Sequence, residues 1–156
     1  MWYIYRKKLM EIKEPYQPEE FQAYFKARWE FLRKPHGFPK GSEIDDFENI
    51  SLHVMAVDSE NVVGVARLTY RSTGEGQIRY MGVDEKYRNK NIGHDILIYL
   101  ENEAVKMGLH QIFLNARKDA IPFYKKNKYL EVGDRFKGFA DIEHVRMEKH
   151  LLSPGA

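Results

Sequence analysis

The stretch RYMGVDEKYRNKNIGHDIL, residues 79–97, changes from a strand-like run to a basic turn and then to apolar residues at helical spacing. It predicts a strand that ends near Val83 and a helix that begins near Ile92. The first main-chain N–H groups of a helix have no partner inside it, and the peptide dipoles place about half a positive charge there. Three basic side chains surround the same turn, those of Lys86, Arg88 and Lys90. The stretch therefore predicts an anion site that suits a diphosphate.

Gly93 is the residue of this turn that would let an oxyanion approach the main chain closely, because it has no Cβ. Each charge-assisted hydrogen bond to such an anion contributes on the order of 1.5–3 kcal/mol. Basic strand-to-helix turns also carry glycines merely for packing. The turn alone leaves both interpretations open.

The segments before the turn predict a strand, a helix and a three-strand meander. A short aromatic segment at the N-terminus is followed by a helix that starts at Pro18 and ends at Pro35. Its expected core stripe consists of Phe21, Phe25, Trp29 and Leu32. Residues 35–51 form a turn-rich and then acidic loop, and such long loops are usually either functional or disordered. The β-branched runs of residues 52–83 break at 58–61 and 72–76, which predicts three strands joined by hairpins.

The segments after the turn predict a long helix, a buried strand, a short helix and two closing strands. Apolar residues recur every four positions over residues 92–108, and Gly108 supplies the stop. Residues 111–117 read as a buried strand. A short helix capped by Asp119 follows, with Pro122 in its first turn. Residues 130–137 and 141–151 are the last two strand candidates, so the order predicts an α/β fold with a mixed sheet and helices on both faces.

The composition is that of one ordinary soluble domain. The chain has 156 residues, 43% hydrophobic and 31% charged, and 25 Lys and Arg against 23 Asp and Glu give a net charge of only +2. This charge is too small to indicate a nucleic-acid partner. The chain has no cysteine, which excludes a thiol nucleophile and a cysteine-based metal site. The N-terminal segment does not fit a signal peptide and no run is long enough to span a membrane, so we expect a cytoplasmic protein.

The turn and its neighbours resemble two motifs of the GNAT N-acetyltransferase superfamily. The acetyl-CoA loop of that family reads Arg/Gln-x-x-Gly-x-Gly/Ala after the fourth strand, and here RNKNIG matches at Arg88 and Gly93, with Asn91 where the first glycine is usual. Asn adopts positive φ more readily than other non-glycine residues, but its side chain could crowd a pyrophosphate. The block LNARKDAIPFYKKNKYLEVG, residues 114–133, resembles the later family motif, with Lys128 where Gly is common. RWEFLRKP, VARLTY, QIRYMGV, LNAR and IEHVRM are similar to ElaA-like and related uncharacterised bacterial or archaeal acetyltransferases.

The resemblance implies a single GNAT domain over residues 1–156, with a mixed, mostly antiparallel sheet, and acetyl-CoA as cosubstrate. The main-chain N–H that polarises the thioester would lie in the last residues of the fourth strand, where Gly82 would permit a bulge. The implied cofactor-binding residues are Met81, Gly82, Val83, Arg88, Asn89, Lys90, Asn91, Ile92, Gly93, His94, Asn115, Phe123 and Tyr124.

Two side chains are candidates for catalysis. Tyr124 matches the family's helix tyrosine and would protonate the departing thiolate, although it could also simply pack beside Phe123. The fourth strand offers no carboxylate as general base, so His144 is the candidate, while Glu143 points to the other side by strand alternation. A structural histidine, with the proton passed through water, is the alternative.

Three further residues are candidates for acceptor binding. Arg67 and Arg79 both share strand faces with apolar residues, and a buried guanidinium needs a partner. The partner would be either a structural carboxylate, from Glu48 or Asp141, or an acidic group of the acceptor. His36 would lie on the long loop that borders the acceptor site in relatives, or would simply be exposed to solvent.

The sequence therefore favours direct acetyl transfer to an amine of a small molecule or peptide. A catalytically inactive CoA-binding or regulatory module is the first alternative, because of Asn91 and the missing strand carboxylate. An RNA or polyanion binder is the second, supported only by the basic patches FKARWEFLRK and KYRNK. Relatives are often dimers, so a homodimer is possible, whereas nucleic acid, membrane and metal are not expected.

Overall fold

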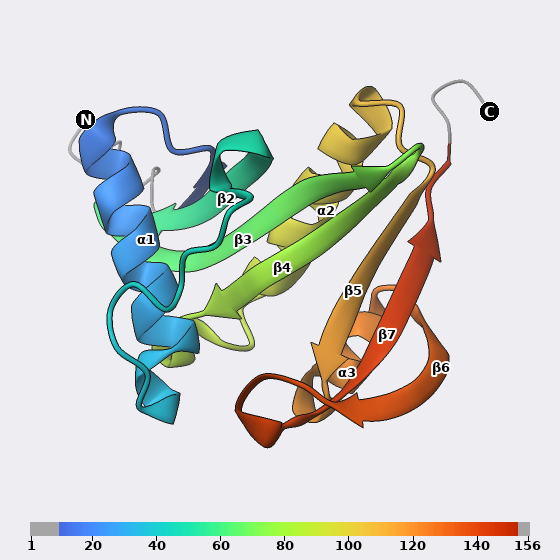
Figure 1. The fold of residues 1–156 in the computed structure, drawn as a ribbon. Coiled ribbons are helices and arrows are strands. Elements are labelled where there is room, and N and C mark those ends of the chain that lie inside the picture. The colour runs from blue at the N-terminus through green and yellow to red at the C-terminus, as the bar shows by residue number, and fades with distance from the viewer. Residues whose placement is uncertain (1–9, 153–156) are drawn as a thin grey trace. The chain divides into compact units, whose positions relative to one another are not determined.

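A computed structural model describes residues 10–152, in which seven strands form one sheet with the order β1-β2-β3-β4-β5-β7-β6 (Figure 1). The strands are β1 Met10–Lys13, β2 Ser51–Asp58, β3 Asn61–Ser72, β4 Glu75–Val83, β5 Gln111–Arg117, β6 Leu130–Lys137 and β7 Glu143–His150. The helices are α1 Pro18–Leu32, α2 Ile92–Lys106 and α3 Ile121–Lys126. β4 pairs with β5 in parallel, whereas β1 with β2, β5 with β7 and β6 with β7 are antiparallel. The expected α/β class and mixed, mostly antiparallel sheet are confirmed.

The described chain forms two compact units. Residues 10–67 and 80–100 make the first, and residues 68–79 and 101–152 make the second. β3, β4 and α2 each contribute residues to both units. Residues 1–9 lie outside the described residues. They include most of the N-terminal segment that was expected to form a strand and not to fit a signal peptide.

Within the first unit, α1 and α2 cover opposite faces of β2 and β3 (Figure 1). Met55 and Val65 pack with α1 in a buried cluster. The adjacent Gly64 faces the other way, because a Cβ placed on it would lie 2.9 Å from Ile96 Cδ1 of α2. Alternation along β3 therefore explains why helices lie on both faces here, as expected.

α1 begins where the sequence predicts, but its most buried face is different. The Glu20 carboxylate accepts the main-chain N–H of Gln17 at 2.9 Å, which caps the helix start at Pro18. The deepest side chains are Tyr24 and Arg28, each 0% exposed, whereas the predicted stripe residues are only partly buried. A buried arginine cannot be read from apolar periodicity, so the predicted stripe lies one residue off the true centre of the buried face.

The second unit places β7 between β5 and β6 (Figure 1). α3 follows a 3₁₀ turn, Lys118–Ala120, and its N-cap is Ala120 without a side-chain cap, so the prediction that Asp119 caps it is wrong. Its C-terminus is closed by Lys128, which has φ +76° and follows Asn127. The Tyr129 N–H donates to Tyr124 O at 3.0 Å, and the Lys128 N–H donates to Lys125 O at 3.0 Å. This pattern is a Schellman motif built on a residue other than glycine.

Candidate active site

The connection between β4 and α2 is anchored to the β2–β3 hairpin. The Asp84 N–H donates to Val63 O at 2.8 Å, and the Asp84 carboxylate accepts the Lys86 N–H at 3.0 Å. The Tyr87 hydroxyl donates to Asp58 Oδ2 at 2.6 Å. These contacts hold the segment just ahead of the predicted anion site.

The turn itself has the backbone shape that an anion site requires. Asn89 and Asn91 both have φ +63°. Asn91 O accepts the Asp95 N–H at 2.9 Å, so Asn91 caps α2 and the N–H groups of the three residues after it precede the first intrahelical bond. Left-handed residues in a turn make successive N–H groups converge on one point, which binds anions. The prediction that Asn91 can supply the positive φ of the usual glycine is therefore confirmed.

Basic side chains surround this turn. Arg88 and Lys90 are exposed, and the Lys90 ammonium lies 5.6 Å from the centroid of the Tyr87 ring. Both charges are therefore available to an anion in solvent.

The irregularity in β4 lies at Tyr80, not at Gly82 as the sequence predicts. Tyr80 has φ +54°, a region that costs a non-glycine residue roughly 1–2 kcal/mol. Gly82 serves another purpose, since a Cβ on it would lie 2.8 Å from Leu32 Cδ2 of α1. The end of α1 packs directly on the strand at this point.

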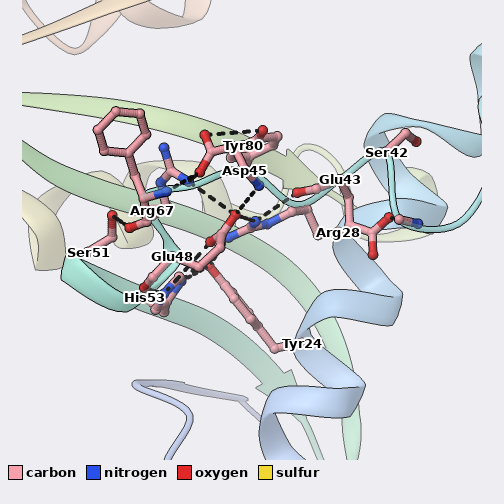
Figure 2. Close-up of polar contacts among 12 residues, drawn as sticks. Tyr24, Arg28, Ser42, Glu43, Asp45, Glu48, Ser51, His53, Arg67 and Tyr80 are labelled. Carbon is pink, nitrogen blue, oxygen red and sulfur yellow. Dashed lines mark hydrogen bonds and ion pairs between the residues drawn. The ribbon is translucent and has the colours of Figure 1, made fainter.

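A buried cluster of charged residues surrounds the Tyr80 ring (Figure 2). The guanidinium carbon of Arg28 lies 4.3 Å from the ring centroid and that of Arg67 lies 4.9 Å from it. Glu48 Oε2 accepts hydrogen bonds from Nη1 of Arg28 at 2.8 Å and of Arg67 at 3.1 Å. Asp45 Oδ1 also accepts from Arg67 Nη1, at 2.6 Å. Two buried cations are thus balanced by two carboxylates of the long acidic loop.

His53 and Tyr24 form the lower layer of this cluster (Figure 2). The Tyr24 hydroxyl lies 2.8 Å from His53 Nδ1, and His53 Nε2 donates to Glu48 O at 2.8 Å. Burial lowers the pKa of His53 below its usual value, and burial raises the pKa of Tyr24 to about 12. Both groups are therefore neutral at pH 7, and they add no charge to the cluster.

The three predicted acceptor residues lie in different settings. Arg67 is 1% exposed and paired with Asp45 and Glu48, so the structural carboxylate predicted from Glu48 is confirmed. Arg79 is exposed, so the expectation that it projects from an apolar face is wrong. The reason is that Ile78 and Tyr80 on either side of it occupy the buried face. His36 is half-buried in the 3₁₀ turn Lys34–His36 after α1.

Tyr124 lies in the second unit with its side chain 8% exposed. Its ring makes edge contacts with Phe123 at 5.1 Å and with Tyr129 at 5.8 Å between centroids. Burial raises the pKa of Tyr124 to about 12, against the weaker opposing effect of the Arg117 charge. The phenol is therefore protonated throughout the physiological range, as a general acid requires.

His144 is also in the second unit, on β7, and is 7% exposed. Its Nδ1 lies 2.7 Å from Ile142 O, and because a carbonyl only accepts, Nδ1 carries the proton. The His144 ring stacks on the Phe136 ring, with 5.9 Å between the ring centroids. In the neutral ring Nε2 is then the atom able to accept a proton.

Two other residues considered from the sequence also lie in the second unit. Glu143 pairs with Arg135 at 3.0 Å. Asn115 on β5 is exposed and lies opposite Arg146 of β7.

The predicted residues thus form two groups. The first unit holds Met81, Gly82, Val83, Arg88, Asn89, Lys90, Asn91, Ile92, Gly93, His94, Arg67 and His36. The second unit holds Asn115, Phe123, Tyr124, His144 and Arg79. The sequence missed the anchor between Tyr87 and Asp58 and, apart from the Arg67–Glu48 pair, the cluster around Tyr80. The acidic part of the long loop was the available signal, since its carboxylates need cationic partners.

Two absences concern residues 10–152. Within this range no helix has both the length and the apolar content needed to cross a bilayer. Over the same range, no three His, Asp or Glu side chains gather as a group that could bind a metal ion.

Comparison with known proteins gives concordant matches. The family model described as "Acetyltransferase (GNAT) domain" matches residues 38–151. The uncharacterised N-acetyltransferase YjcF of Bacillus subtilis (strain 168) is 33% identical over 131 residues, which cover 84% of this chain and 93% of that protein.

Three solved structures share the fold. An acyl-CoA N-acyltransferase from Pseudomonas aeruginosa superposes with a TM-score of 0.77 at 20% identity, covering 90% of this chain and 97% of that one. An aminoglycoside 6'-N-acetyltransferase complexed with coenzyme A superposes with a TM-score of 0.74 at 18% identity, covering 94% of this chain and 99% of that one. Escherichia coli ElaA superposes with a TM-score of 0.77 at 14% identity, covering 90% of this chain and 97% of that one.

Proposed function

Because this chain belongs to the GNAT acetyltransferase family, we propose that it transfers an acetyl group from acetyl-CoA directly to an amine of a small molecule or peptide. N-acetylation with acetyl-CoA follows from the family. The direct route and the acceptor class are the specific part of the proposal. The direct route is supported by the absence of cysteine, which removes the commonest carrier of a covalent acetyl group.

The observation that carries the proposal is the turn from Arg88 to Gly93. Asn89 and Asn91 have positive φ just before α2, a conformation that favours convergent main-chain N–H groups, and exposed basic side chains flank the turn. These features suit the diphosphate of acetyl-CoA, which would accept main-chain hydrogen bonds and the charges of Arg88 and Lys90.

The proposed chemistry uses main-chain and side-chain groups of this protein. Acetyl-CoA supplies an activated thioester when bound. The N–H groups of Met81–Val83 would polarise the acetyl carbonyl by donating hydrogen bonds to its oxygen. As the new amide C–N bond forms and the C–S bond breaks, Tyr124 would give its proton to the sulfur. His144 Nε2 would take the proton of the acceptor amine, directly or through water.

Two residues are proposed on the acceptor side. Exposed Arg79 would contact an acidic group of the acceptor, and His36 would border the acceptor site. If Arg79 does so, Arg79→Met raises the acceptor KM and leaves the Kd for CoA unchanged. Arg67 is not part of this proposal, because its guanidinium is already neutralised.

We propose further that residues 1–156 work as a single acetyltransferase domain. The support is that β3, β4 and α2 run through both compact units, so neither unit is a contiguous piece of chain.

The proposed binding step is tested by thermal unfolding with acetyl-CoA. At about 100 times Kd, ligand binding stabilises the folded state by about 2.7 kcal/mol and raises Tm by several degrees. Gly93→Glu should abolish the shift, since it places a carboxylate where the diphosphate binds. Asn102→Glu, at an exposed position on the same helix, adds the same charge and should keep the shift. No shift in the unaltered protein contradicts the proposal.

Turnover is tested by thiol release from acetyl-CoA with a panel of amines. The assay is clean here because the protein has no cysteine to react with the thiol reagent. Amine-dependent release supports the enzyme. Binding of acetyl-CoA without release for any amine would favour the inactive CoA-binding alternative.

A further inference from the structure

Tyr80, in the interior of β4, has a backbone conformation that strands do not use. Its φ is +54° although β4 continues on both sides of it, from Glu75 to Val83. For a bulky side chain such a φ is a genuine outlier. Strain of this kind persists only where the surroundings enforce it, and it concentrates at functional sites. The contacts of Tyr80 show what enforces it.

The Tyr80 ring is 9% exposed and is surrounded by guanidinium groups (Figure 2). Arg28 of α1 and Arg67 of β3 lie 4.3 Å and 4.9 Å from the ring centroid, and Arg33 at the end of α1 lies 5.2 Å from it. Cations near an aromatic ring face are attracted to it, the more so when both are desolvated. We call Arg28 and Arg67 with this ring the arginine clamp.

The arginine clamp is itself fixed in place by the acidic loop. Glu48 Oε2 accepts from both guanidiniums, and Asp45 Oδ1 accepts from Arg67 at 2.6 Å. Glu43 O accepts from Arg28 Nη1 at 2.9 Å. Neither guanidinium can move without losing charge-assisted hydrogen bonds in a buried site, so the ring between them is held as well.

We infer that Tyr80 is a positioning residue for acetyl transfer, and the inference rests on the proposed function. The arginine clamp holds Tyr80 in its left-handed conformation, and this turns the following N–H groups, those of Met81–Val83, out of the strand direction and toward the acetyl carbonyl. Glycine would adopt the same φ without strain, but it has no ring for the clamp to hold. This explains why a strained tyrosine occupies the position.

The test is isotope-edited infrared spectroscopy of bound acetyl-CoA labelled with ¹³C at the carbonyl. Hydrogen bonds from the main chain lower the carbonyl stretching frequency relative to free acetyl-CoA. In Tyr80→Gly the lowering should be largely lost while the Kd for CoA stays unchanged. Tyr80→Phe keeps the ring in the clamp and should restore the lowered frequency.

Controls separate this inference from general damage. Tyr70→Gly makes the same replacement at a tyrosine that is 50% exposed on β3, and should keep the lowered frequency. If Tyr80→Gly does not fold, Asp45→Ala decides, since it removes the 2.6 Å pair on Arg67 and the 3.5 Å contact with the Tyr80 hydroxyl and should lose part of the lowering.

Three outcomes overturn the inference. A wild-type frequency in a Tyr80→Gly or Asp45→Ala protein that binds acetyl-CoA would show that the clamp does not direct the N–H groups. A Tyr80→Phe protein that binds but lacks the lowering would exclude the ring. Failure of the unaltered protein to bind acetyl-CoA instead overturns the proposed function, and this inference with it.

Discussion

The hydroxyl of Tyr87 donates a 2.6 Å hydrogen bond to Asp58 Oδ2, which joins the basic turn before α2 to the last residue of β2. This bond raises the pKa of Tyr87 above its usual value, because the carboxylate favours the protonated phenol. The turn that we propose as the diphosphate site is thus fixed to the sheet by a side-chain contact and not only by its own backbone.

Tyr87→Phe should therefore weaken CoA binding without abolishing it. Loss of one hydrogen bond that orders a binding turn raises Kd by roughly three- to tenfold. Isothermal titration with CoA measures the effect. Tyr99→Phe is a matched control, because Tyr99, on α2 beyond its first turn, donates an equally short 2.6 Å bond to Glu14. Equal Kd values for Tyr87→Phe and Tyr99→Phe would contradict the anchoring role.

Tyr124→Phe should lower kcat by roughly 10²–10⁴ if Tyr124 is the general acid. Tm should change little, because phenylalanine keeps the contacts with Phe123 and Tyr129. Once an acceptor amine is found, steady-state kinetics and a melting curve measure both. A loss of less than about threefold would exclude an acid role of the usual size.

The pH profile gives an independent check on Tyr124. Burial raises its pKa to about 12, so the acid form persists as pH rises and is lost only near that value. We expect no fall in kcat between pH 8 and 10 that depends on this phenol. An alkaline decline in that range that disappears in Tyr124→Phe would be the contrary result.

Much of the fold follows from local patterns in the sequence. α2 and its stop at Gly108 are predicted because the apolar repeat and the glycine are adjacent in the chain, and Gly108 indeed has φ +82°. The left-handed Asn91 is predicted for the same reason, since Asn tolerates positive φ without help from distant residues.

The arginine clamp could not be predicted in this way. A carboxylate such as Glu48 could be predicted for Arg67 from its apolar strand face, but Arg28 reads only as part of a basic patch, and nothing local indicates that the loop brings Asp45 and Glu48 onto both guanidiniums. The same long-range contacts move the irregularity of β4 from the expected Gly82 to Tyr80. Local propensity favours glycine at positive φ, but tertiary contacts outweigh it here.

Lys128→Gly should stabilise the protein. Lys128 closes α3 at φ +76°, where glycine avoids the steric cost of a Cβ. After allowing for the greater freedom of glycine in the unfolded chain, we expect a gain of about 0.5–1 kcal/mol in the free energy of unfolding and a rise in Tm of roughly 1–4 °C. Lys126→Gly, inside the last turn of α3, should instead cost about 1 kcal/mol. Destabilisation by both replacements would mean that the lysine side chain matters more than the backbone.

His53→Gln should flatten the dependence of stability on pH. Burial lowers the pKa of His53 in the folded protein, so as pH falls through about 6.5 the unfolded chain takes up the proton first and the free energy of unfolding decreases. Below the folded pKa this loss stops growing. Glutamine can still donate to Glu48 O and lie against the Tyr24 hydroxyl, two of the polar contacts of the ring, but it does not titrate. Urea denaturation from pH 5 to 8 measures the slope, with His150→Gln, at an exposed histidine, as the control. If the free energy of unfolding depends on pH with the same slope in His53→Gln and His150→Gln, titration of the buried His53 ring does not cause the loss of stability at low pH.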